Sequence, residues 1–389
     1  MKIAGIIAEY NPFHNGHAAH IRRTRERAGC DAVVVCMSGN ITQRGELTCL
    51  SKQTRARMAL MNGADAVFEL PALYACRTAD VFAASGVQIL GGLGVDLLSF
   101  GCEKECAELL VPYSCLLDDE SDAFKARVRE KLDQGMSHAR ARGEAAAEEM
   151  DVSPALLNRP NAVLGAEYLR ALRREFPSVE PVIIERTSGY HDTALSSDAS
   201  ATAIRSAMRE GRSAEAAAAV PENVRAFITD APPTHAPDDI ALWCLRNASP
   251  EYIRSLPDVA EGLENRLLHA AKESATLDAL LSALKCKRYT YARLSRLAAH
   301  AMLGLTASLA ESHPRPEYAR LLGMRADRRD LLTELKHRSG IPIVSDPIAL
   351  RGDPVFELEC RATDLRSLCE DRPELRVHGR EFTEKFTRV

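Results

Sequence analysis

Apolar residues recur along the first hundred positions in short continuous runs that alternate with segments of helical periodicity. The first run, residues 3–8, contains no polar position, which is typical of a parallel strand covered on both faces. It ends before Asn11-Pro12, because proline donates no hydrogen bond to a sheet and disfavours helix at the residue before it. Further strands are expected at 32–37, 66–70, 95–100 and 182–184, with helices at 18–28, 52–62 and 78–90 between the first four strands. This order predicts a parallel α/β sheet whose ligand crevice lies at the carboxyl ends of the strands.

The pattern changes after about residue 211. The α/β alternation ends between residues 211 and 221, and from about 223 to 324 apolar residues recur mainly with helical spacing. Short strand-like runs follow at 341–344 and 355–358. We therefore expect two domains, residues 1–215 with the parallel sheet and residues 216–389 mainly helical, each long enough for its own core.

The composition, with 46% hydrophobic and 27% charged residues, is that of an ordinary soluble protein. No apolar run reaches the roughly 18 residues of a membrane span, and the first residues do not have the pattern of a signal peptide. The eleven cysteines include no Cys-x-x-Cys pair, and the nearest two, Cys102 and Cys106, are too few ligands to make a zinc site. We expect reduced thiols, a cytoplasmic location, no membrane partner and no metal site in the protein.

The turn after the first strand carries the strongest chemical signal. Residues 11–17 read Asn-Pro-Phe-His-Asn-Gly-His and lead into a helical pattern. A strand, a tight turn and a helix start form an anion site, because the first N–H groups of a helix lack internal partners. His14 and His17 could donate hydrogen bonds to phosphate oxygens there, which suggests attack on a nucleoside triphosphate. Two alternatives stay open: ordinary turn and cap residues, and, as the weakest, a metal site that includes His20.

A second phosphate-binding segment is expected where another helix begins after a Ser-rich loop. Ser200, Thr202 and Arg205 add two hydroxyls and a guanidinium to a helix N-terminus, and could hold a triphosphate from the side opposite the histidines. The alternative is a simple helix cap with an arginine nearby. Further candidate contacts to phosphate, ribose, base or substrate, each of which could instead be an ordinary packed or solvated residue, are Arg186, Tyr190, His191, Lys52 and Arg55.

A basic segment in the second half is a candidate RNA contact. The net charge of −4 argues against a surface wholly coated by nucleic acid, but it allows a local basic face. Residues 285–296 hold five cations, no acids and two tyrosines. The expected phosphate contacts are Lys285, Lys287, Arg288 and Arg293, and the expected stacking residues are Tyr289 and Tyr291. The alternative is a solvated helix face with the tyrosines in the core, and residues 336–338 form a weaker second patch.

These residues resemble a known group of enzymes. Residues 11–17 resemble the histidine-x-glycine-histidine motif of the nucleotidyltransferase superfamily, and residues 200–205 resemble its second motif. More closely, the chain is similar over nearly its full length to the bacterial tRNA(Met) cytidine acetate ligase family. The segments that carry this resemblance are 9–17, 37–40, 43–46, 51–52, 68–71, 188–192 and 287–293.

The resemblance implies a Rossmann-like nucleotidyltransferase domain followed by a mainly helical tRNA-binding domain. It implies an ATP-dependent reaction with acetate that gives acetyl-adenylate, with His14 and His17 as catalytic residues assisted by Mg²⁺. The acetyl group then passes to N4 of the wobble cytidine of elongator tRNA(Met). Carried over by position, the nucleotide contacts are Ile7, Ala8, Glu9, Tyr10, Asn11, Pro12, Phe13, His14, Asn15, Gly16, His17, Ala18, Ala19, His20, Gly101, Asn161 and Arg186. The chain departs from the family pattern at Ala162, Glu185 and Cys286.

Two other functions stay open at this point. A small-molecule adenylyltransferase would transfer AMP to a phosphorylated metabolite, but such a substrate does not require the large helical half. A non-catalytic RNA-binding protein could retain the fold, but His14, His17, Ser200, Thr202 and Arg205 are all present. The sequence therefore favours the ligase.

Overall fold

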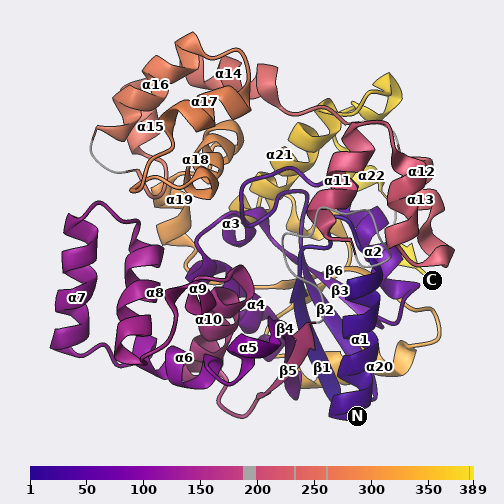
Figure 1. Ribbon diagram of the computed structural model, residues 1–389. Coiled ribbons are helices and arrows are strands. Elements are labelled where there is room, and N and C mark those ends of the chain that lie inside the picture. The colour runs from indigo at the N-terminus through magenta and orange to yellow at the C-terminus, as the bar shows by residue number, and fades with distance from the viewer. Residues whose placement is uncertain (187–198, 232–233, 260–261, 385) are drawn as a thin grey trace.

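A central sheet with helices on both faces organises the protein (Figure 1). The computed structural model describes residues 1–186, 199–231, 234–259, 262–384 and 386–389. The strand order is β5-β4-β1-β2-β3-β6-β7, and β8 pairs with β6. The five parallel strands are β1 (Ile3–Ala8), β2 (Ala32–Ser38), β3 (Ala66–Leu70), β4 (Leu97–Glu103) and β5 (Glu180–Arg186). The remaining strands are β6 (Ala319–Met324), β7 (Ile343–Val344) and β8 (Thr387–Arg388).

The alternation of side chains along each strand explains why these runs are apolar throughout. On β1, Ile3 and Ile7 belong to the core on one face, while Ile6 belongs to the core on the other face. Helices α4 (Ala79–Gly92) and α10 (Pro160–Glu175) cover the first face, and α1 (Asn15–Ala28) and α2 (Lys52–Leu60) cover the second. Both faces of the sheet are therefore buried, as the uninterrupted apolar runs predict.

The direction of winding reverses next to β1. The chain crosses from β1 to β2 and β3 on one side, and then to β4 and β5 on the other side. In doubly wound sheets the crevice at such a reversal, outside the carboxyl ends of the strands, is where ligands bind. The turn after β1 and the ends of β4 and β5 therefore border the expected ligand crevice.

Shorter helices form satellite groups around this sheet. One group follows β4: α5 (Lys104–Ala107), α6 (Leu110–Asp118), α7 (Asp122–Asp133), α8 (His138–Glu149) and α9 (Pro154–Leu157), and all but α5 share a small core of their own. Another, at the upper left of Figure 1, surrounds a separate core: α14 (Asp238–Asn247), α15 (Pro250–Arg254), α16 (Leu263–Glu273), α17 (Leu277–Leu284) and α18 (Tyr291–Leu303). The others are α3 (Ala72–Ala75), α11 (Ala201–Arg209), α12 (Ser213–Ala216), α13 (Ala226–Thr229), α19 (Ala307–Ser312), α20 (Arg329–Arg338), α21 (Pro354–Leu368) and α22 (Arg380–Thr383). No helix among the described residues has the length and apolar content that a membrane span needs.

The parallel α/β sheet and its first five strands are confirmed, with shifts at the strand ends. The expected strand at 95–100 begins at Leu97 and continues to Glu103, and the one at 182–184 extends at both ends. The run at 341–344 contains the two-residue strand β7. The division at residue 215 stays a prediction, and residues beyond it do contribute to the sheet of the first half through β6.

Two expectations for the second half are wrong. Residues 319–324, within the stretch expected to be helical, form the buried strand β6, which pairs antiparallel with β3. A short, mainly apolar run such as 319–324, which also contains Arg320, does not by itself distinguish a buried strand from a helix. Residues 355–358, expected to be a strand, lie in α21, because the Asp353 side chain accepts a hydrogen bond from the Phe356 amide and Pro354 occupies the first helical turn.

A buried cluster of charges ties the end of the chain to the sheet. The Lys52 ammonium lies 2.6 Å from Glu69, 3.0 Å from Glu359 and 2.8 Å from Glu381. Arg320 also pairs with Glu69, at 2.8 Å, and with Glu381. Burial and the charge of Glu69 raise the pKa of Glu359 to about 7. A proton on Glu359 would leave two carboxylates facing two cations, so that the cluster is neutral.

Lys52 and Arg55 are therefore structural residues, and their expected role as pyrophosphate or substrate contacts is wrong. The Lys52 side chain is enclosed by carboxylates and is 1% exposed. Arg55 is fully buried and donates to the backbone carbonyls of Glu9, Ser38, Gly39 and Leu50. Glu359, one of the partners of Lys52, lies 307 residues further along the chain, so nothing in the sequence near Lys52 indicates this contact.

Replacing Lys52 by methionine should destabilise the protein strongly. The substitution leaves Glu69, Glu359 and Glu381 facing a single guanidinium in a buried site. We expect the free energy of unfolding to fall by about 3–5 kcal/mol, as when one partner of a buried ion pair is removed. Urea denaturation followed by far-UV circular dichroism measures this change. Lys125→Met, at an exposed position of α7, is the matched control and should change stability by less than about 0.5 kcal/mol; equal, small losses in both variants would contradict a structural role for the cluster.

Candidate active site

Helix α1 begins with a capping box built from two histidines. His14 is the N-cap residue in an extended conformation, and its Nδ1 accepts a hydrogen bond from the Gly16 amide at 3.1 Å. In return, Nδ1 of His17 accepts a hydrogen bond from the His14 amide at 3.2 Å. Because both Nδ1 atoms act as acceptors, the proton of each neutral ring resides on Nε2. The cap thus fixes the tautomer in which each Nε2–H is a hydrogen-bond donor.

The environment of the pair keeps both rings neutral. Burial, together with the charge of Arg186, lowers the pKa of His14 to about 3. Burial and the neighbouring His14 ring lower the pKa of His17 well below its usual value. The two ring centroids are only 3.7 Å apart, so two protonated rings would repel strongly. The site therefore offers two uncharged N–H donors side by side.

Arg186 brings a fixed positive charge to the histidines. The pairing of β4 with β5 aligns Gly101 with Ile184 and Glu103 with Arg186. A Cβ atom at Gly101 would lie 3.2 Å from Cγ and Cδ of Arg186, so the glycine leaves room for the arginine side chain. Nε of Arg186 is buried and has no hydrogen-bond partner among the described residues. A buried, unpartnered N–H beside two histidine donors is suited to an anionic ligand.

The second expected segment lies against the first one. Ser200 is the N-cap of α11, and its Oγ accepts a hydrogen bond from the Ala203 amide at 3.2 Å. Arg205 donates to the carbonyl of Asn11 at 2.7 Å and also lies near Glu46 and Thr202, at 3.3 and 3.4 Å. The structure therefore brings residues 200–205 and the histidine turn together. Arg205 is committed to holding the turn, while the Thr202 hydroxyl is on the exposed side of the helix.

The backbone of the turn is held from both sides. Tyr10 has a φ of 48°, a conformation that non-glycine residues rarely adopt. Arg55 donates to the carbonyl on one side of it, that of Glu9, and Arg205 to the carbonyl on the other side, that of Asn11. The Tyr10 ring packs against the His17 ring, with centroids 4.7 Å apart. These contacts compensate for the local strain and fix where the histidines lie.

Several of the other expected nucleotide residues have side chains that are buried or already bonded within the protein. The side chains of Ile7, Tyr10 and Phe13 are buried, so they would reach a ligand only through their backbone. His20 is bonded to Ser99 at 3.0 Å, and Asn161 donates to Glu103 at 2.6 Å, so each is engaged within the protein. The Gly16 and Ala203 amides are bonded within the caps, so these two are not available to a phosphate. Tyr190 and His191 lie outside the described residues.

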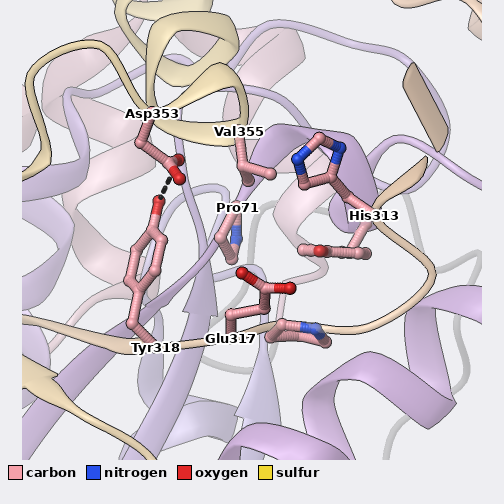
Figure 2. Close-up of a pocket in the computed structure, with 8 residues that line it drawn as sticks. Pro71, His313, Glu317, Tyr318, Asp353 and Val355 are labelled. Carbon is pink, nitrogen blue, oxygen red and sulfur yellow. Dashed lines mark hydrogen bonds between the residues drawn. The ribbon is translucent and has the colours of Figure 1, made fainter.

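A small cavity lies apart from the histidine turn and is not an alternative nucleotide site. It is lined by Pro71, Tyr74, His313, Pro316, Glu317, Tyr318, Asp353 and Val355. Figure 2 shows the Tyr318 hydroxyl bonded to Asp353 across one side of it, at 3.2 Å. Its volume of about 10 Å³ is room for about one water molecule. A nucleotide or a base does not fit there.

The basic segment is partly exposed and partly structural. Lys285, Lys287 and Arg288 are exposed in the connection between α17 and α18. Tyr289, by contrast, is 5% exposed within the core of the helical group, so it presents no ring face to a base. The hydroxyl of Tyr291 donates to Asp278 at 2.8 Å, and Arg293 donates to the Asp258 carbonyl at 2.7 Å. The core alternative therefore holds for Tyr289.

The weaker basic patch lies far from this segment. It forms the end of α20, where Arg338 pairs with Asp96 at 3.0 Å, just before β4 and so at the amino ends of the strands. Sequence reasoning missed Trp243, the single tryptophan, which is 70% exposed on α14 of the helical group. The signal that could have found it is a large aromatic residue on the polar side of an amphipathic helix.

Comparisons with known proteins extend over the whole chain. Residues 1–380 match the model of a family described as HIGH Nucleotidyl Transferase. The chain is 36% identical to the tRNA(Met) cytidine acetate ligase of Acetivibrio thermocellus, over 99% of both chains, and 36% identical to that of Clostridium kluyveri, over 95% of both. It is also similar to two crystal structures of Thermotoga maritima TmcAL, each 29% identical over 100% of both chains. The TM-score is 0.91 for the apo form and 0.90 for the form bound with alpha-thio ATP.

The neutral state of the histidines predicts a loss of stability in acid. In an unfolded chain a histidine titrates near about 6.5, so below that pH the unfolded state binds protons that the folded site excludes. The contribution of these groups to stability is therefore full above pH 6.5 and falls as the pH decreases toward the lowered pKa of His14. We expect each imidazole to account for about 1–2 kcal/mol of the loss in unfolding free energy between pH 7 and pH 5.

The double variant His14→Ser and His17→Gln tests this origin. Serine at the N-cap and glutamine three residues later preserve a capping box without titratable groups. Urea denaturation at pH 7 and pH 5 should show a smaller acid loss for the variant than for the parent chain. Parallel losses in the two proteins would mean that other groups cause the effect.

Proposed function

Since the chain belongs to the HIGH nucleotidyl transferase family and, within it, to the tRNA(Met) cytidine acetate ligases, we propose that it activates acetate with ATP and acetylates N4 of the wobble cytidine of elongator tRNA(Met). The observation that carries this proposal is the pair of capped, neutral histidines beside Arg186 at the switch point of the sheet. Relatives that cover nearly the whole chain are ligases, which argues against the small-molecule adenylyltransferase and the non-catalytic RNA-binding protein.

In the first step an acetate oxygen attacks the α-phosphorus of ATP. The bond from that phosphorus to the bridging oxygen breaks, and pyrophosphate leaves with its electron pair. The Nε2–H groups of His14 and His17 donate to phosphate oxygens as negative charge grows on them, and Arg186 adds a full positive charge. Because the rings are neutral before ATP binds, their donation strengthens with the charge that the reaction creates.

In the second step N4 of the cytidine attacks the acetyl carbon of acetyl-adenylate. The carbon–oxygen bond to AMP breaks, AMP leaves, and the nitrogen loses a proton. No covalent intermediate on the protein is needed, so none of the eleven cysteines has to act as a nucleophile. All eleven are free thiols, which agrees with a cytoplasmic location.

Mg²⁺ would accompany the triphosphate. It prefers oxygen ligands and is usually held by one or two carboxylates together with phosphates. Glu9 and Glu46 are the carboxylates next to the histidine turn, and burial, with a smaller contribution from the charge of Glu46, raises the pKa of Glu9. A divalent cation would offset this repulsion, so the donor set fits. When bound, it would shield charge on the triphosphate and on the departing pyrophosphate.

The tRNA would contact the helical group through its exposed cations. Lys285, Lys287 and Arg288 lie together in one connection and have no acidic residue between them. Basic side chains bind nucleic acid mainly through phosphates. Tyr291 remains a candidate stacking residue, and the exposed Trp243 takes the place of Tyr289, which is buried.

Mass spectrometry of the RNA product tests the reaction. After incubation of an elongator tRNA(Met) transcript with the protein, ATP and acetate, nuclease digestion should yield one acetylated cytidine at the wobble position. Product should require both ATP and acetate, and a transcript with uridine at that position should remain unmodified. The variant His14→Ser with His17→Gln should fold and bind tRNA but form product at least about 100-fold more slowly, because two donors to the reacting phosphate are lost. Absence of acetylation, or AMP transfer without acetate, would overturn the proposal.

Salt dependence tests the RNA surface. Lys287→Ala combined with Arg288→Ala should weaken tRNA binding several-fold and lower the slope of log affinity against log salt by about 2, one for each lost phosphate contact. Fluorescence anisotropy with labelled tRNA at several salt concentrations measures both quantities. Lys125→Ala with Arg129→Ala removes two exposed cations from α7 and is the matched control, with no expected change. Equal effects of the two pairs would contradict a specific surface between α17 and α18.

A further inference from the structure

Two cysteines and a glutamate come together where β4 ends. Cys102 and Glu103 are the last residues of β4, and Cys106 lies in α5, which follows directly. The two sulfur atoms and a carboxylate oxygen all lie within 4.8 Å of one another. Among the described residues this is the only group of three or more His, Cys, Asp or Glu side chains with such spacing. His14, His17 and His20 do not form one, so the metal alternative for the histidines has no support from the geometry.

The spacing of these atoms matches tetrahedral coordination. Two thiolates and a carboxylate on one Zn²⁺ ion would lie about 3.5–3.8 Å from one another, given zinc–sulfur bonds of about 2.3 Å and zinc–oxygen bonds of about 2.0–2.2 Å. Oε2 of Glu103 already lies 4.0 Å from Sγ of Cys102. Cys102 and Cys106 are fully buried and Glu103 is 8% exposed. Small side-chain movements would therefore bring the two sulfur atoms and the carboxylate oxygen to the distances that one bound zinc ion requires.

Two neighbouring residues, Asn161 and Arg159, act on the glutamate and on one of the thiols. Asn161 donates to Oε1 of Glu103 at 2.6 Å and so directs Oε2 toward the thiols. Such an outer hydrogen bond to a ligating carboxylate is a usual feature of metal sites. Burial raises the pKa of the Cys106 thiol, and the nearby Arg159, which pairs with Glu105 at 2.8 Å, opposes part of this rise.

We propose that Cys102, Glu103 and Cys106 bind a Zn²⁺ ion, with a water molecule as the fourth ligand. Two soft sulfur ligands with one oxygen favour zinc over magnesium or calcium, which take oxygen ligands. The ion would link the end of β4 and α5 to the first turn of α10, which carries Asn161; these elements lie side by side (Figure 1). Gly101 directly precedes the site on β4. Zinc would thus brace one wall of the nucleotide crevice, and its binding does not depend on the proposed reaction.

Metal analysis of the full-length protein tests this site. The protein is reduced with a phosphine, stripped with a chelator, equilibrated with Zn²⁺ and gel-filtered before its zinc content is measured. We expect one bound ion per chain in the parent protein and its loss in Cys102→Ser and in Cys106→Ser. Cys115→Ser and Cys286→Ser are matched controls at exposed cysteines and should keep the ion.

Two spectroscopic and binding measurements guard against misfolded variants. Co²⁺ in place of zinc should give sulfur-to-metal charge-transfer absorption and the visible bands of tetrahedral cobalt in the parent protein, with no charge transfer in a variant lacking both thiols. Glu103→Gln keeps both thiols and should lower zinc affinity at least about tenfold in competition with a chromogenic chelator. Failure of the reduced parent protein to retain zinc, or equal retention by the parent and by Cys102→Ser, overturns the proposal.

Discussion

The ammonium group of Lys52 holds together segments that lie far apart in the sequence. Its three carboxylate partners come from β3, α21 and α22, and Arg320 of β6 shares two of them. Desolvating these charges is costly, and the cost is offset only when all the partners are in place and the charges are balanced. The charges of Lys52 and Arg320 lower the pKa of Glu381 to about 2 although burial alone would raise it, whereas burial raises that of Glu359 to about 7. The cluster therefore accepts only one arrangement of the sheet, α2 and the last seventy residues.

This constraint reaches the active site through a single helical turn. Arg55 follows Lys52 by three residues on α2, and its guanidinium fixes the carbonyls of Glu9, Ser38 and Gly39 at the ends of β1 and β2. From the other side Arg205 fixes the carbonyl of Asn11. The turn between them then has little freedom, which is what a site needs when its donors must be positioned before the ligand arrives. Arg205 thus acts on the turn directly, while Glu359 and Glu381, near the end of the chain, act on it through Lys52 and Arg55.

Local signals in the sequence were sufficient to predict the five parallel strands and the turn that carries the histidines. The uninterrupted run at residues 3–8 and the turn that follows it are fixed by short-range physical chemistry: burial on two faces, a proline and a helix cap. What could not be predicted depends on distant partners. The roles of Lys52 and Arg55 are decided by Glu359 and by carbonyls of other segments, and β6 becomes a strand because β3 offers it an edge. The prediction that Tyr289 stacks on a base was wrong for the same reason, since its burial depends on how several helices pack. Glu103 was not singled out in the sequence, because only the fold brings two thiols beside it.

The neutrality of the histidines bears on how such a site favours reaction over mere binding. Protonated imidazoles would attract the triphosphate strongly in its ground state, and that attraction would contribute little to lowering the barrier. Neutral Nε2–H donors interact more weakly with the bound substrate and gain strength as charge accumulates on the leaving pyrophosphate. The capping box contributes to this, because it occupies both Nδ1 atoms and so leaves the proton of each neutral ring on Nε2. A feature that is normally regarded as helix stabilisation therefore sets the tautomer of the proposed catalytic groups, while burial together with Arg186 keeps the rings uncharged.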